Sequence, residues 1–194
     1  MTPRPFWALV GALTLGVAHL APAQAPAARH GFWGAFGLGY GANGLTCSGG
    51  CSFNSDTKGG GLTAALKLGG TLSPRVRLGG EVNVWTKDHG DVTESVGNVS
   101  VAVYFYPTAR GGFFVKGGVG GGSFQLSQGS STESANGFGF VTGLGYDIRV
   151  GSKVSLSPIA NFYFGHDGDL TDASGTIPGI RHAIVDFGLS VQYN

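Results

Sequence analysis

The stretch RHAIVDFGLSVQY, residues 181–193, alternates between two kinds of side chain. Its odd-numbered positions from Ala183 to Tyr193 are apolar, whereas the positions between them include Asp186, Ser190 and Gln192. Successive side chains of a β-strand point to opposite faces, so a period of two predicts a strand with one apolar and one polar face. The stretch is also long enough to cross a bilayer as a tilted strand, which takes ~9–11 residues.

The same period recurs from residue 31 onward and is interrupted at intervals by turn residues. Seven more strands are predicted, at residues 31–42, 60–70, 75–86, 95–106, 112–125, 136–149 and 153–165. Short connections alternate with long ones, the short ones at 71–74, 107–111 and 150–152 and the long ones at 43–59, 87–94, 126–135 and 166–180. This layout is typical of periplasmic turns and extracellular loops. We therefore predict an all-β fold, an eight-stranded antiparallel up-and-down transmembrane β-barrel.

Charged residues make up only 12% of the chain, and none of them falls on the apolar face of the predicted strands. A charge that faces lipid costs ~2–4 kcal/mol at the bilayer midplane, whereas a charge in the lumen can be solvated or paired. We therefore expect the apolar face to contact lipid. Seven charges fall on the lumenal face: Lys67, Arg77, Glu81, Lys116, Asp147, Arg149 and Asp186. The orientation of Ser123 and Phe124 stays open.

A soluble sandwich or lipocalin-like barrel also alternates, but it buries its apolar face and carries its charges outside. The polar face of this chain holds too few charges for a water-exposed surface. Glycine is frequent on that face, where eight strands must curve tightly around large side chains. The inward glycines are predicted at Gly37, Gly39, Gly118, Gly120, Gly139, Gly143 and Gly145.

Ion pairs are expected inside the barrel. If the loop at 126–135 joins its two strands symmetrically, Lys116 faces Asp147 across the strand pair. Glu81 is expected to lie near Arg77 and Lys67 as a second cluster.

The first residues are predicted to be a cleavable secretory signal peptide, residues 1–23. Arg4 supplies the positive start, an apolar stretch follows, and Ala21-Pro22-Ala23 fits a small-residue cleavage site. Cleavage after Ala25 and an uncleaved membrane anchor are the alternatives. Residues 24–30 then form a short spacer, and residues 31–194 form the barrel.

Cys47 and Cys51 are the two cysteines of the chain. An even count in an exported protein favours a disulfide between them. A two-cysteine metal site is the alternative, but no histidine lies nearby to complete four ligands.

From residue 31 to the end, the chain resembles the small eight-stranded outer-membrane barrels of Gram-negative bacteria, the OmpA and OmpX type. The most specific part of the resemblance is the final strand, which is similar to the assembly signal of that family at Asp186, Gly188, Val191 and Tyr193; Asn194 departs from it by one position. The resemblance implies export by the general secretory route, recognition by the barrel-assembly machinery and residence in the outer membrane.

Several functions are disfavoured by the sequence. A net charge of +1 gives no electrostatic basis for nucleic-acid binding, and eight strands enclose space only for their own side chains, which disfavours a diffusion pore. None of the histidines predicted near loop bases, His89, His166 and His182, begins the His-x-Ser motif that lipid A deacylases of this architecture carry. Asp167, Asp169 and Asp172 are potential calcium ligands, but their spacing departs from the EF-hand pattern.

We therefore predict a non-enzymatic barrel without catalytic residues, cofactor or metal. It is expected to be a monomer in outer-membrane lipid, with a structural or surface-interaction role. An extracellular ligand would meet the long loops. A small porin-like channel and a lipid A-modifying enzyme remain the alternative functions.

Overall fold

The computed structural model describes residues 29–48, 59–90, 92–129, 131–172 and 175–194, and in this part of the chain the regular elements are all β-strands. They are β1 (Phe32–Thr46), β2 (Gly59–Ser73), β3 (Val76–Asp88), β4 (Val92–Phe105), β5 (Phe113–Gln128), β6 (Ser131–Tyr146), β7 (Ile148–Arg149), β8 (Val154–Asp172) and β9 (Gly175–Tyr193). None of the described residues belongs to a helix that is long and apolar enough to span a membrane.

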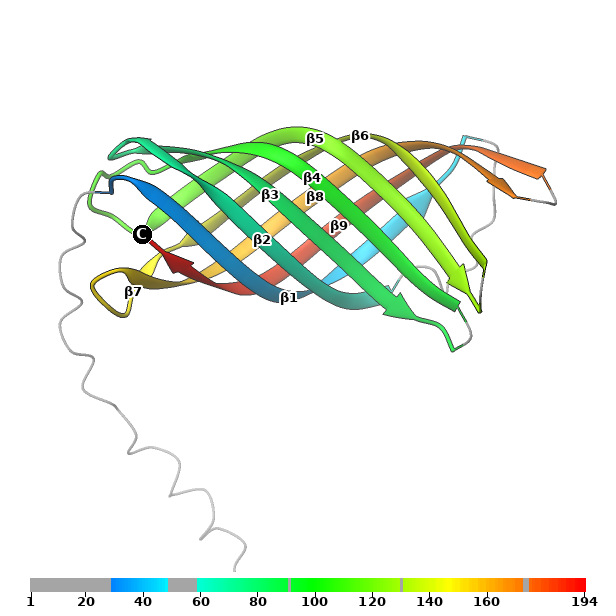
Figure 1. Cartoon of the computed structure of the whole chain (residues 1–194), viewed down its shortest axis with the longest axis horizontal. Coiled ribbons are helices and arrows are strands. Elements are labelled where there is room, and N and C mark those ends of the chain that lie inside the picture. Colours follow the sequence, from blue (N-terminus) through cyan, green and yellow to red (C-terminus); the bar gives the residue numbers. More distant parts are fainter. Residues whose placement is uncertain (1–28, 49–58, 91, 130, 173–174) are drawn as a thin grey trace, which may run out of the picture.

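The strands form a closed antiparallel barrel (Figure 1). From β1 to β6 each strand pairs with the next one along the chain, β6 and β7 both pair with β8, β8 pairs with β9, and β9 returns to pair with β1 from Gly34↔Tyr193 to Thr46↔Arg181. The predicted fold class, and the predicted closure between the first and last strands, are thereby confirmed. The start of β1 and the C-terminus lie at one end, the turn end, and the β8–β9 hairpin reaches beyond the other strands at the opposite hairpin end.

β7 is the continuation of β6 rather than a ninth strand of the wall. Both pair with β8 in the same register, on either side of Pro158. Proline has no backbone N–H and cannot donate to the ladder, so the pairing is interrupted opposite it. The strand predicted at 136–149 therefore corresponds to β6 and β7 together.

The strands are longer at the hairpin end than predicted. Most of the segments predicted as loops at 87–94, 126–135 and 166–180 are strand, and β5 and β6 pair as far as Gln128↔Ser131. These extensions consist mainly of hydroxyl, amide and charged residues, so they lack the apolar face on which the prediction depended. β8 and β9 also change register around Gly168, where the backbone φ of +79° favours glycine.

The expected Lys116–Asp147 pairing is wrong, because the chain turns tightly between Gln128 and Ser131, whereas that pairing needs a turn centred about two residues further along. Lys116 is opposite Gly143, four residues from the expected partner. Phe124, left open by the sequence, points inward and is 1% exposed.

Outside and inside are chemically distinct around the ring. The outward face is apolar on every wall strand: β8 carries half-buried side chains such as Phe162 and Phe164, and the other strands carry exposed ones, for example Tyr40 and the neighbouring Phe187, which are 59% and 67% exposed. Inward glycines allow the wall to curve: a Cβ on Gly39 would lie 2.6 Å from the Phe187 carbonyl oxygen, and one on Gly120 would overlap the Val99 carbonyl oxygen of the adjacent strand.

Candidate functional site

The turn end of the lumen is closed by a cluster of Arg29, Arg77, Tyr106 and Asp147. The Arg29 guanidinium lies over the Tyr106 ring, 3.5 Å from its centroid, and 3.9 Å from the Asp147 carboxylate. Tyr106 donates to Asp147 (2.9 Å) and accepts from Arg77 (3.2 Å). Burial, the largest influence, raises the pKa of the Tyr106 phenol, so this group stays protonated and able to donate.

Arg29 also reaches the far side of the mouth. It precedes β1, yet its guanidinium donates to the carbonyl oxygens of Ala109 (3.1 Å) and Gly111 in the turn between β4 and β5. The Arg29 side chain therefore lies across the opening of the barrel at the turn end. Residue 29 was predicted to belong to a mere spacer, and the structure gives it a specific buried position.

A second level of polar contacts spans the middle of the lumen. The Lys116 ammonium is 2.6 Å from Glu81 Oε1, and Glu81 also accepts from the Tyr104 hydroxyl. Lys67 is the cross-strand neighbour of Glu81. Asn161 donates to Asp186 at 2.7 Å. The ion pair of Lys116 and Glu81 thus joins the non-adjacent strands β5 and β3, whereas Lys67 and Asp186 have these neighbours on adjacent strands.

The third level lies toward the hairpin end. His182 Nδ1 is 2.6 Å from Asp167 Oδ2, and His182 Nε2 is 3.1 Å from Asn98 Oδ1. Because β9 and β4 are equally distant around the ring in both directions, the His182–Asn98 contact crosses the full lumen. A parallel link joins Asn43 on β1 to Glu94 on β4 at 2.8 Å.

Apolar side chains fill the same end of the lumen around this polar level. Five of them are 3% exposed or less: Val96, Phe124, Ala135, Ile180 and Ile184. Leu126 and Ile177 pack against this cluster from the hairpins. The long hairpins therefore extend the core instead of standing apart from it.

The lumen leaves little free space at its middle. A cavity of about 10 Å³ lies beside Thr63, Lys67, Asn161 and Asp186. That is about the volume that holds one water. Among the described residues, no three of His, Cys, Asp or Glu are placed to hold a metal ion.

The structure places the predicted site residues as follows. Six of the seven predicted lumenal charges are buried inside: Lys67, Arg77, Glu81, Lys116, Asp147 and Asp186. Arg149 differs, because it is half-exposed at the end of β7 and donates to the Ser152 carbonyl oxygen, in the turn that follows, at 3.1 Å. Arg77 lies with Asp147 and not with Glu81, whereas Lys67 does neighbour Glu81.

The assembly-signal residues all lie on β9. Asp186 and Gly188 point inward, whereas Val191 and Tyr193 are exposed on the outward face. Cys51 and the signal peptide lie outside the described residues, so the disulfide with Cys47 and the cleavage site stay predictions.

Besides Arg29, three buried groups toward the hairpin end were missed by the sequence analysis. Glu94, Asp167 and His182 were assigned to loops or loop bases, although all three are 2% exposed or less. The continued alternation of Glu94, Val96 and Asn98 is the signal that could have placed Glu94 inside.

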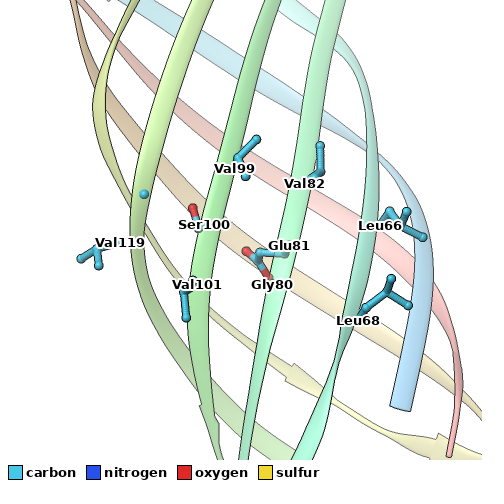
Figure 2. A pocket seen from close by; sticks show the side chains of 10 residues that line it. Leu66, Leu68, Gly80, Glu81, Val82, Val99, Ser100, Val101 and Val119 are labelled. Carbon is cyan, nitrogen blue, oxygen red and sulfur yellow. The ribbon is translucent and has the colours of Figure 1, made fainter. Parts of the chain in front are cut away.

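The outer surface carries grooves between its apolar side chains. In the groove of Figure 2, leucine and valine side chains surround Gly80, and the volume is about 370 Å³. Gly80 faces outward with open space where a Cβ would lie. The groove is lined by apolar side chains, as expected of a surface in contact with lipid.

No protein-family model and no curated protein matches the sequence. Solved structures do match the fold. Neisserial surface protein A is 13% identical with a TM-score of 0.54, and the match covers 82% of this chain and 96% of that chain. The attachment invasion locus protein of Yersinia pestis, Ail, is 10% identical with a TM-score of 0.52, covering 85% and 100%.

The fold is that of a small outer-membrane β-barrel. At these identities the similarity concerns the fold alone. The role of this barrel is therefore inferred from its filled lumen and its hairpins.

Proposed function

We propose that the protein is a non-enzymatic outer-membrane barrel that presents its hairpins at the cell surface, in a structural or surface-interaction role. The turn end then faces the periplasm and the hairpin end faces outward. The observation that carries the proposal is the combination of an apolar outward face all round the ring with a lumen that is crosslinked from wall to wall.

A conducting pore is disfavoured by that lumen. Ion pairs, hydrogen bonds and aromatic rings cross it at three levels, and the small central space has room for one water. A hydrated ion has no continuous path of its own size through such packing. The hairpins, and not the lumen, are therefore the part able to meet a partner.

Enzymatic activity is disfavoured because a substrate cannot reach the candidate catalytic pair. The His182–Asp167 pair resembles a catalytic dyad in its geometry, but both side chains are fully buried. A catalytic base must come within hydrogen-bond reach of its substrate. Asn98 occupies the other ring nitrogen, so this pair serves packing of the hairpin end against the opposite wall.

Biogenesis in this proposal follows the general secretory route, with cleavage after Ala23 and recognition of the last strand by the barrel-assembly machinery. Residues 24–28 then precede Arg29 in the mature chain. A Cys47–Cys51 disulfide would close a short loop next to the end of β1, in keeping with an oxidising compartment.

The test is membrane fractionation of cells that express the full chain, followed by electrophoresis with and without heating. The proposal expects the protein in the outer-membrane fraction, with a compact species that changes mobility when heated. Recovery of the protein in the soluble periplasmic fraction would refute the proposed location.

A further inference from the structure

The outward face of β3 to β6 changes character toward the hairpin end. The cross-strand row Val82, Val99, Gly121 and Phe138 is apolar apart from the glycine. Of the eight positions in the next two rows, six carry a hydroxyl or amide group, and the other two are Val84 and Gly97. We call these six residues the neutral polar face: Thr86, Ser95, Ser123, Gln125, Ser134 and Asn136.

This face is accessible and uncharged. Gln125, Ser134 and Asn136 are exposed, and the other three are half-buried. The Thr86 and Ser95 hydroxyls are 3.4 Å apart, which keeps them together at the surface. Each side chain of the face can both donate and accept a hydrogen bond.

The outward face of β8 and β9, next to the neutral polar face, carries charged side chains instead. The row that contains Val82 and Phe138 continues to His166 and Arg181, where the Arg181 guanidinium donates to the His166 ring at 3.1 Å. A phosphate or sulfate group would be attracted to that cationic side. The neutral polar face lacks a cation, so it suits a neutral ligand with many hydroxyl groups.

We propose that the neutral polar face binds the sugar hydroxyls of a glycolipid in the outer leaflet around the barrel. This inference rests on the proposed function, since it takes the apolar rows below the face to lie in lipid. Side chains on the barrel wall point sideways, toward neighbouring lipids, and Phe138 (60% exposed) lies one row below at the apolar boundary. Hydroxyl and amide groups directly above that boundary are at the depth of the lipid headgroups.

The test uses the full chain in phosphatidylcholine nanodiscs that contain a small fraction of digalactosyldiacylglycerol, a neutral glycolipid, and in a parallel set that contains phosphatidylglycerol instead. Native mass spectrometry measures the association constant of the glycolipid relative to phosphatidylcholine. A preference of about tenfold is expected, since several hydrogen bonds of ordinary strength contribute together. The variant S95A/Q125A/S134A should lose it. The control T46A/S48A/T176A removes three exposed hydroxyls from the β1 and β9 side and should keep it.

The possible outcomes distinguish failure of this inference from failure of the proposed function. If the triple variant does not fold, Gln125→Ala alone should reduce the preference about threefold. A correctly inserted wild-type barrel with no glycolipid preference would overturn the inference and leave the proposed function intact. A preference for phosphatidylglycerol that is abolished by salt would also overturn the inference, because it would indicate that lipid binds at Arg181 and His166. Failure of the wild-type chain to insert at all would refute the proposed function.

Discussion

The two ends of the barrel are closed by different chemistry. At the turn end, the guanidinium of Arg29 stacks on Tyr106 beside Asp147. At the hairpin end, buried apolar side chains such as Phe124 and Ile180 surround the His182–Asp167 pair. Strands that alternate strictly can thus fill their lumen with either kind of side chain, and the choice decides how each end tolerates substitution.

Both ends depend on closure between β1 and β9. Deletion of residues 191–194, or Tyr193→Asp, should abolish assembly, because unpaired backbone groups in lipid cost several kcal/mol each. Pulse-chase protease digestion of the periplasm is the measurement, and a degraded chain is expected. Outer-membrane levels equal to wild type would contradict the pairing of Tyr193 with Gly34.

The polar level in the middle of the lumen contains the ion pair of Lys116 and Glu81. Lys116→Met should lower the free energy of unfolding by about 3–5 kcal/mol, because Glu81 is left as a buried charge without its main partner. Urea titration in lipid vesicles measures this. The double variant K116M/E81M should recover most of the loss, and a double variant as unstable as the single one would argue against an ion pair.

At the hairpin end, Phe124→Ala should cost about 3–5 kcal/mol through the cavity it leaves. The matched control is Phe138→Ala on the outward face, where lipid fills the vacated space and the loss should be much smaller. Equal losses in the two variants, again from urea titration, would contradict the inward orientation of Phe124.

At the turn end, Arg29→Ala should cost about 2 kcal/mol, since it removes charged hydrogen bonds to two carbonyl oxygens but leaves no large cavity. Arg29→Lys should recover only part of this, because an ammonium cannot reproduce the planar fork. His30→Ala, which alters an exposed neighbour, is the control. An unfolding free energy unchanged in Arg29→Ala would mean that the guanidinium does not close the mouth.

The sequence predicted the strands and their inward faces far better than the side-chain contacts inside the lumen. Alternation in 181–193 and the other strands was enough to place Lys67, Glu81 and Asp186 inside, since each position depends only on its own strand. The ion-pair partner of Lys116 could not be predicted, because Glu81 lies two strands away on β3 and the contact depends on the registers of β3 with β4 and of β4 with β5.

Arg29 could not be found from the sequence for a different reason. Its partners are a turn far along the chain and the face of Tyr106, and no local period marks such a contact. At the hairpin end, alternation continues through polar residues, so the pattern weakens just where β5, β6, β8 and β9 leave the apolar band.

Single-channel recording tests whether the lumen is closed at its three levels. Purified full-length protein, folded as judged by its heat-dependent mobility, is added to a planar bilayer under applied voltage. The account predicts insertion without steady conductance. Steady channels of nanosiemens size from the same preparation would contradict it and would indicate a pore.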